Sequence, residues 1–169
     1  MHSRGKGDDL RIYRALILIS ILLAIDQYTK WVVQQNVQPW RIIRVSSFLN
    51  IVNVRNRGMV FGFLQDAKSP WVFWLITLVS LAAAVFVVYL FFKENEFIPR
   101  FSLSLIIAGA AGNLINRLTQ GSVLDFLDFH WGSHHWPVFN FADACITVGS
   151  LILIIYLFLK GGENVSDSV

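Results

Sequence analysis

Two aspartates lie beside long apolar segments, where charge is normally excluded, and carboxylates in that setting suit acid–base chemistry. Asp125 ends the segment Ser122-Val-Leu-Asp, and Asp143 stands where the last hydrophobic run begins. An ionised carboxylate in hydrocarbon costs about 3 kcal/mol or more, so an intramembrane acid indicates a functional site. Two carboxylates a few ångströms apart share one proton, and one can then act as a base while the other acts as an acid. The pair predicts the chemistry of an aspartic protease.

Asp128 competes with Asp125 for this role, and strand geometry separates the two residues. If residues 123–130 are extended, alternate side chains lie on opposite faces. Asp125 then shares a face with Val123, whereas Asp128 points the other way. We therefore assign Asp125 to the pair and expect Asp128 to be a solvated or hydrogen-bonded surface acid.

Asp143 also has a purely structural interpretation. The pattern Asn140-x-x-Asp143 after Pro137 resembles a helix N-cap with an acid at the third position, where it favours the helix dipole. Capping alone could explain this acid. The two interpretations are compatible, because a carboxylate held at a helix start is well oriented and can still face a cavity.

Three histidines raise the alternative of a metal site. His130, His134 and His135 could form a zinc site with Asp125 or Asp128. They stand among tryptophans in a short loop, however, and aromatic and amphipathic side chains are enriched at membrane surfaces in any case. We predict no metal and keep a histidine-dependent metallohydrolase as a second alternative function.

The composition is that of a membrane protein. The chain has 169 residues, of which 55% are hydrophobic and 15% charged, whereas soluble domains have about 45–50% and about 25%. This length suits one membrane-embedded domain covering residues 1–169. The formal charge of +3 comes from basic residues that mostly flank apolar segments. Contact with lipid headgroups explains them better than binding of nucleic acid.

The apolar segments predict four transmembrane helices, because a spanning helix needs about 20 mostly apolar residues. The predicted spans are residues 12–33, 70–92, 101–118 and 138–159. Residues 41–63 are rich in β-branched residues and predict strands, which we expect to form a small antiparallel sheet with residues 121–130 on the membrane surface.

The unusual polar residues gather at one face, because four spans place the loops at residues 34–69 and 119–137 on the same side. These residues are Asp26, Lys30, Asn56, Asn113, Arg117, Asp125, Asn140 and Asp143. Asp26 and Lys30 stand four residues apart, which predicts a structural ion pair. Arg117 could hold a carboxylate or a peptide carbonyl, or extend to the membrane surface.

A small transporter or proton-relay protein is the main non-enzymatic alternative, since intramembrane acids also serve proton relays. Relay residues should extend to both faces of the membrane. The polar residues of this chain collect at one face, which favours an enzyme.

Polar residues and glycines recur in four ordered blocks. The blocks are Asp26-Gln27-x-x-Lys30, Asn56-x-Gly58-x-x-Phe61-Gly62, Gly109-x-x-Gly112-Asn113-x-x-x-Arg117-x-x-x-Gly121-x-Val123-x-Asp125-Phe126 and Phe139-Asn140-x-Ala142-Asp143-x-x-Ile146-x-x-Gly149. Together they resemble bacterial lipoprotein signal peptidase, the signal peptidase II family. The resemblance runs from about residue 12 to residue 160.

The resemblance implies an aspartic endopeptidase that removes signal peptides from prolipoproteins, cutting just before a cysteine that carries diacylglycerol. Asp125 and Asp143 match the family's catalytic pair. By the same carry-over, the expected substrate-binding or pair-positioning residues are Asn56, Asn113, Arg117 and Asn140, and the expected structural residues are Asp26 and Lys30. No cofactor is implied.

The resemblance also implies a topology that charge counts leave open. Lysines and arginines are evenly divided between the two sides, although the basic residues before the first helix favour a cytoplasmic N-terminus. The family has four transmembrane helices in the bacterial inner membrane, both termini in the cytoplasm, and a sheet cradle and active site at the periplasmic face. The expected partners are diacylglyceryl-modified prolipoproteins and membrane lipids, and we expect a monomer.

The chain departs from the family pattern at two places. Asn116 replaces an aspartate that is common before the arginine, which could change how Arg117 is held. Met59-Val60 replaces an alanine pair and could narrow a contact with substrate or inhibitor. Because Gly58 and Gly62 flank this segment, we expect it to form a mobile apolar flap.

Overall fold

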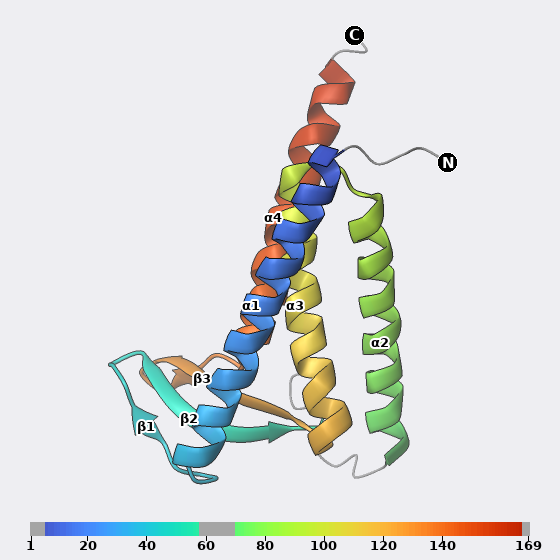
Figure 1. Cartoon of the computed structure of the whole chain (residues 1–169). Helices are drawn as coiled ribbons and strands as arrows, with labels where there is room; N and C mark the ends of the chain where they lie inside the picture. The colour runs from blue at the N-terminus through green and yellow to red at the C-terminus, as the bar shows by residue number, and fades with distance from the viewer. Residues whose placement is uncertain (1–5, 58–69, 167–169) are drawn as a thin grey trace.

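The computed structural model describes residues 6–57 and 70–166, so the expected flap at residues 58–62 lies outside the described residues. Four helices form a bundle, with a small sheet at the end away from the start of α1 and the end of α4 (Figure 1). The helices are α1 (Lys6–Asn36), α2 (Pro70–Lys93), α3 (Phe97–Gln120) and α4 (Phe141–Ser166). The strands are β1 (Ile43–Arg44), β2 (Leu49–Asn56), β3 (Val123–Trp131) and β4 (His134–His135). Each of the four helices is long and apolar enough to cross a membrane, which confirms the predicted fold class.

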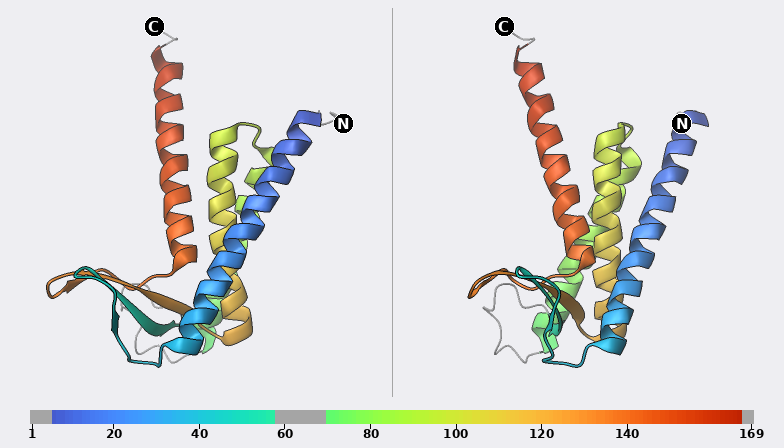
Figure 2. Two further views of the ribbon diagram at one scale, coloured as in Figure 1. Left: turned by 60° about the vertical axis from the view of Figure 1, so that its left-hand side comes forward. Right: turned by 90° about the vertical axis from the view of Figure 1, so that its left-hand side faces the viewer.

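The helix α3 forms the centre of the bundle (Figure 2). In the most apolar 18-residue stretch of α3, 56% of the residues are buried, compared with 11–17% in the corresponding stretches of the other three helices. Small residues make this close packing possible. A Cβ atom added to Gly109 would lie 2.3 Å from the carbonyl oxygen of Ala142, and one added to Gly112 would lie 2.3 Å from Oδ2 of Asp26. The glycines therefore let α1 and α4 approach α3 closely.

Three helices extend beyond their predicted spans. The helix α1 covers residues 6–36 instead of 12–33, and α3 covers 97–120 instead of 101–118. Hydropathy detects only the part of a helix that suits hydrocarbon, whereas the backbone hydrogen bonds continue into the polar layers. The same reason applies to the end of α4, which runs past residue 159 to Ser166.

The start of α4 was predicted at residue 138, and this was wrong, because the helix begins at Phe141. The preceding segment is extended and pairs with β3 instead. The Phe139 amide donates to the Leu127 carbonyl over 3.1 Å, and the Leu127 amide donates back to the Phe139 carbonyl over 2.8 Å. These bonds satisfy the Phe139 backbone outside a helix. They also tie Asn140, the next residue, to the sheet on one side and to α4 on the other.

The sheet is antiparallel, with the strand order β1-β2-β3-β4. In the central pair, Val54 lies opposite Asp125 and Asn50 lies opposite Asp128, with a register shift between Ile51 and Val54. Of the predicted strand region 41–63, residues 43–44 and 49–56 are strands, and residues 58–63 lie outside the described part of the chain.

The second strand region begins at Val123 rather than at residue 121. Gly121 instead ends α3 in a left-handed conformation, with φ of 65°, and its amide donates to the Arg117 carbonyl over 3.0 Å. A residue with a side chain would be strained at this φ, so glycine suits the cap. The expected loop around His134 and His135 is also corrected, because these two residues form β4 and pair with Trp131 and His130.

Candidate active site

The first turn of α4 holds Asp143 through a reciprocal cap. The Asp143 amide donates to Oδ1 of Asn140 over 3.0 Å, and the Asn140 amide donates to Oδ2 of Asp143 over 3.2 Å. This is a capping-box arrangement, which fixes the side chain of the third residue by the geometry of the helix start. The capping interpretation of Asp143 is thus confirmed, and its other oxygen, Oδ1, remains directed to a second partner.

Asn113 of α3 is that second partner. Its Nδ2 donates to Oδ1 of Asp143 over 2.7 Å, and its own Oδ1 accepts from Nδ2 of Asn140 over 3.2 Å. Asn140 is fully buried and Asn113 is 5% exposed. The two asparagines therefore fix each other and Asp143 in a single arrangement.

Asp125 of β3 joins the same network through Asn140. The Nδ2 atom of Asn140 donates to Oδ1 of Asp125 over 2.6 Å, and Nδ2 of Asn56 donates to Oδ2 over 2.9 Å. Asn56 reaches Asp125 from the end of β2, because the register places it opposite Val123. Asn140 thus binds one carboxylate through its side chain and the other through its backbone amide.

Burial and charge act on the proton affinity of Asp125, whose side chain is 3% exposed. Burial, followed by the nearby charge of Asp143, raises the pKa of Asp125 from 3.8 to about 6. Hydrogen bonds from Asn56 and Asn140 and the charge of Lys30 oppose this change without cancelling it. A carboxyl group with this pKa can hold or release a proton near neutral pH.

The predicted ion pair between Asp26 and Lys30 is present, with Nζ of Lys30 2.9 Å from Oδ2 of Asp26. Both side chains are buried, with 1% and 2% exposure. Lys30 also donates to Oδ1 of Asn113 over 2.9 Å, and Oδ1 of Asp26 accepts the Ala142 amide over 3.0 Å. The pair consequently links α1 to both α3 and the first turn of α4, beside the site.

Gln27 belongs to this support, although no role was predicted for it. Its Nε2 donates to Oδ2 of Asp26 and to the Gly112 carbonyl, and its Oε1 accepts from Asn116 over 3.3 Å. A polar side chain inside an apolar segment was the available signal. Asn116 therefore contacts α1, and no hydrogen bond joins it to Arg117 within the described residues.

A cavity of about 270 Å³ lies beside Asp143, between α2, α3 and α4. Its polar lining consists of Ser80, Asn113, Arg117 and Asp143, and its apolar lining includes Ala83, Ala84, Val87, Ile106, Ala110 and Ile146. Arg117 is close enough to act electrostatically on both Asp143 and Asp125. Its Nε atom is buried without a hydrogen-bond partner among the described residues. Among the described residues, Asp143 lines this cavity but Asp125 does not.

Asp128 lies in a separate network, as strand alternation predicts. Its side chain is buried, with 5% exposure, so it is hydrogen-bonded rather than solvated. Oδ2 accepts from Asn50 over 2.9 Å, and Oδ1 lies 2.7 Å from Nδ1 of His135. Although burial acts in the opposite direction, these two partners hold the pKa of Asp128 below its ordinary value.

The histidines of the metal alternative do not converge on a common point. His130 and His135 stack with ring centroids 5.1 Å apart. Both ring nitrogens of His130 are buried, and neither has a hydrogen-bond partner in residues 6–57 or 70–166. In the described part of the chain, no group of three or more histidine, cysteine or acidic side chains could hold a metal ion.

Comparison with known proteins relates most of the chain to one family. The sequence profile described as signal peptidase (SPase) II matches residues 18–159. A lipoprotein signal peptidase of Francisella tularensis subsp. novicida is 40% identical over 140 residues, covering 82% of this chain and 87% of that protein. A lipoprotein signal peptidase of Thermodesulfovibrio yellowstonii is 41% identical over 151 residues, covering 89% and 98%.

Solved structures agree with the sequence comparison. A bacterial membrane enzyme determined by the in meso method at 2.3 Å resolution superposes with a TM-score of 0.77 and 30% identity. The superposition covers 90% of this chain and 92% of that one. A second bacterial membrane enzyme, determined by the same method at 1.9 Å, gives a TM-score of 0.74, also at 30% identity.

Proposed function

The chain belongs to the signal peptidase II family, a family of enzymes that remove signal peptides from lipoproteins, and on that premise we propose that Asp125 and Asp143 activate the water that cuts the peptide bond. The observation that carries the proposal is the position of Asn140, which hydrogen-bonds to both carboxylates. One residue can contact both groups only if they lie close together. The proposed substrate is a prolipoprotein, cut before its diacylglyceryl-modified cysteine.

The proposed roles differ because the environments differ. Both carboxylates accept hydrogen bonds at both oxygens, but Asp143 lies in the first turn of a helix, a setting that suits negative charge. Asp125 has the raised pKa. We therefore assign Asp143 as the base that takes a proton from water, and Asp125 as the acid that donates a hydrogen bond to the scissile carbonyl.

The chemical step follows from these roles. The water oxygen bonds to the carbonyl carbon while its proton passes to Asp143. The carbonyl bond of the tetrahedral intermediate then re-forms as the carbon–nitrogen bond breaks, and the leaving amine takes the proton that Asp143 holds, which returns Asp143 to the carboxylate while Asp125 keeps its own proton. Asn56, Asn113 and Asn140 orient the two carboxylates, and Arg117, on the wall of the cavity, is placed to bind a carbonyl or headgroup oxygen of the substrate.

The proposed location is the bacterial inner membrane, with both termini in the cytoplasm and the site near the periplasmic face. The site lies at the sheet end of the bundle, where Asn56 and Asp125 come from strands that reach beyond the helices (Figure 1).

The test is cleavage of a diacylglyceryl-modified prolipoprotein by the purified protein in detergent or vesicles. We expect cleavage just before the modified cysteine, no cleavage of the same precursor without the lipid, and full activity in excess chelator. Loss of activity in chelator would instead favour the alternative function, a histidine-dependent metallohydrolase. If no precursor is cut and vesicles instead show a proton flux that depends on Asp143, the transport alternative holds.

The pH dependence tests the assignment of acid and base. If Asp125 must carry the proton, the competent fraction of free enzyme falls as the pH rises above the pKa of about 6. We expect kcat/KM to fall about tenfold per pH unit between pH 7 and pH 8. The apparent pKa of this descending limb of the pH profile describes the coupled pair of carboxyl groups and not Asp125 alone. Asp128→Asn should leave this limb in place. A kcat/KM that rises to a plateau above pH 7 would reverse the two roles.

A further inference from the structure

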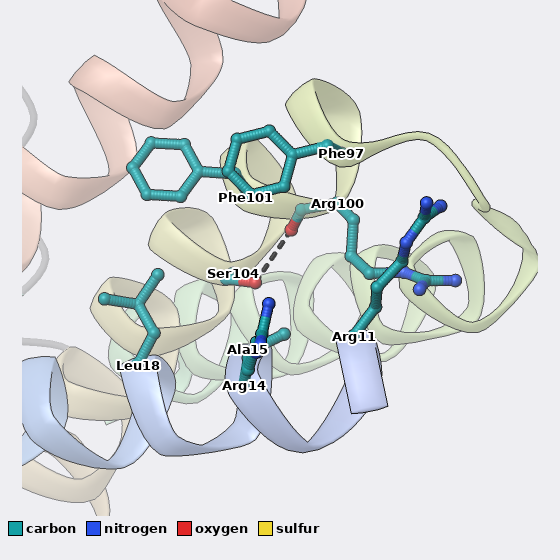
Figure 3. A pocket seen from close by; sticks show the side chains of 8 residues that line it. All are labelled: Arg11, Arg14, Ala15, Leu18, Phe97, Arg100, Phe101 and Ser104. Carbon is teal, nitrogen blue, oxygen red and sulfur yellow. Dashed lines mark hydrogen bonds between the residues drawn. The ribbon is translucent and has the colours of Figure 1, made fainter. Parts of the chain in front are cut away.

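A second cavity, of about 290 Å³, lies between α1 and α3 (Figure 3), near the start of both helices, at the end of the bundle opposite the sheet (Figure 1). Its lining combines three arginines with large apolar side chains. The arginines are Arg11, Arg14 and Arg100, and the apolar side chains include Leu18, Phe97 and Phe101. Neither the proposed chemistry nor the family blocks in the sequence use this place.

Two of the three arginines, Arg11 and Arg100, are separated from the apolar side chains along the cavity, and Arg14 lies between them (Figure 3). The guanidinium nitrogens of Arg11 and Arg100 lie at one end, and Leu18 and the ring of Phe101 lie at the other (Figure 3). The rings of Phe97 and Phe101 stack with centroids 6.1 Å apart and form an apolar wall. A cavity with one cationic end and one apolar end suits an amphiphile with an anionic head.

The arginines keep donors available for a ligand. Arg100 is 3% exposed, pairs with Asp8 over 2.6 Å through one terminal nitrogen and donates to the Glu94 carbonyl through the other, but its Nε atom is buried without a partner among the described residues. Arg11 donates to the Asn95 carbonyl over 3.2 Å through one nitrogen only. Arg14 has no hydrogen bond or ion pair to any described residue. Asp8, the acid that pairs with Arg100, offsets only part of this positive charge.

The height of the cavity matches a lipid headgroup. Arg14 and Lys30 are sixteen residues apart on α1, or about 24 Å at 1.5 Å per residue. The hydrocarbon core of a bilayer is about 30 Å thick. With the candidate active site at one membrane surface, Arg14 therefore lies near the opposite edge of the hydrocarbon core, where a long arginine side chain can extend to the headgroups, and Leu18 lies one turn deeper.

We propose that this cavity binds one anionic phospholipid, with its phosphate on Arg11 and Arg14 and an acyl chain along Leu18 and Phe101. Guanidinium groups pair with phosphate oxygens through two parallel hydrogen bonds, which a zwitterionic surface satisfies less well. The ligand class is independent of the proposed protease chemistry, because the two sites lie at opposite ends of the bundle.

Binding is measured by titrating the purified full chain in detergent with phosphatidylglycerol, phosphatidylcholine or inorganic phosphate, using native mass spectrometry and thermal shift. We expect phosphatidylglycerol to bind at least about tenfold more tightly than phosphatidylcholine, and inorganic phosphate to give no shift at the same concentration. In the Arg11→Gln/Arg14→Gln variant, affinity for phosphatidylglycerol should fall about tenfold, since each arginine contributes a several-fold factor.

Two further variants complete the test. Lys93→Gln removes a basic residue at the same end of the bundle but outside the cavity, and it should bind phosphatidylglycerol like the wild type. Leu18→Trp fills the apolar end without a change of charge and should weaken binding at least several-fold even if the double variant fails to fold. Equal binding of the two lipids, an equal shift with inorganic phosphate, or unchanged affinity in Leu18→Trp would each overturn the proposal. Precursor cleavage in detergent should stay at the wild-type level in all these variants, so the two proposals fail separately.

Discussion

Asp125→Asn and Asp143→Asn are each expected to lower kcat/KM for a lipidated precursor by about 10³-fold or more. General acid–base groups contribute about 10²–10⁴ in rate, and two groups that act as a unit fail together when either is lost. Asparagine keeps the size of the side chain, so Asn140 retains a partner on either side. The measurement is initial cleavage rate on variants whose thermal unfolding is cooperative.

Asp128→Asn is the matched control for this loss. It removes a carboxylate three residues from Asp125 on the same strand, but one that binds Asn50 and His135 instead of Asn140. We expect its cleavage rate to stay near that of the wild type. Substantial activity in Asp143→Asn would show that Asp143 only caps the helix. A folded but inactive Asp128→Asn variant would show that the chemistry belongs to the other face of β3, and not to the face of Asp125.

The Asp125→Asn variant also carries a signature in stability. The folded pKa of about 6 lies above the ordinary value of 3.8, so the folded state binds more protons than the unfolded state across that window. The contribution of Asp125 to the free energy of unfolding is therefore complete below the ordinary pKa of 3.8 and is lost as the pH rises through the folded pKa of about 6. The loss amounts to at most about 3 kcal/mol. Relative to wild type, Asp125→Asn should gain stability between pH 4.5 and pH 7.5. This gain would accompany the loss of activity.

Lys30→Met is expected to destabilise the fold by about 3–5 kcal/mol. The change leaves the Asp26 carboxylate 1% exposed and without its cation, and a buried charge that loses its partner costs about this much. It also removes one of the two donors to Oδ1 of Asn113 and leaves only Nδ2 of Asn140, so Asn113 is held less firmly against Asp143. Denaturant unfolding should show the loss of stability, and the cleavage rate should fall as well.

Two variants distinguish this explanation from a general loss of packing. Asp26→Asn/Lys30→Met removes both charges. This double variant should be more stable than Lys30→Met alone, although it carries one substitution more. Lys93→Met replaces an exposed lysine and should change stability by less than about 0.5 kcal/mol. A Lys30→Met protein as stable as the wild type would contradict the prediction that Lys30 stabilises the fold by neutralising the buried Asp26 carboxylate.

The sequence predicted the parts of the fold that depend on local composition. Apolar length located α2 to within one residue, and strand alternation separated Asp125 from Asp128. The start of α4 could not be found this way. Residues 138–140 are apolar enough for a helix, but Phe139 pairs with Leu127, a partner far away in the chain. Similarly, β4 depends on a turn at Gly132 and on pairing with His130.

The candidate site was predictable as a set of residues but not as a network. Polar residues at one face of four spans were visible in the sequence, and the capping pattern at Asn140 and Asp143 was recognised. The bridging position of Asn140 required the strand and the helix to meet at one residue. The role of Gln27 required α1 to approach Gly112, which only the packed bundle brings about.

The helix α2 packs against α3 and, among the described elements, against no other helix. It nevertheless supplies one wall of the cavity beside Asp143. No described helix therefore closes that cavity on the side between α2 and α4, which faces the plane of the bilayer. A substrate anchored by its lipid can arrive there by diffusion in two dimensions. The turnover of such an enzyme depends on how many precursors lie in each unit of membrane area, and not on their concentration in water.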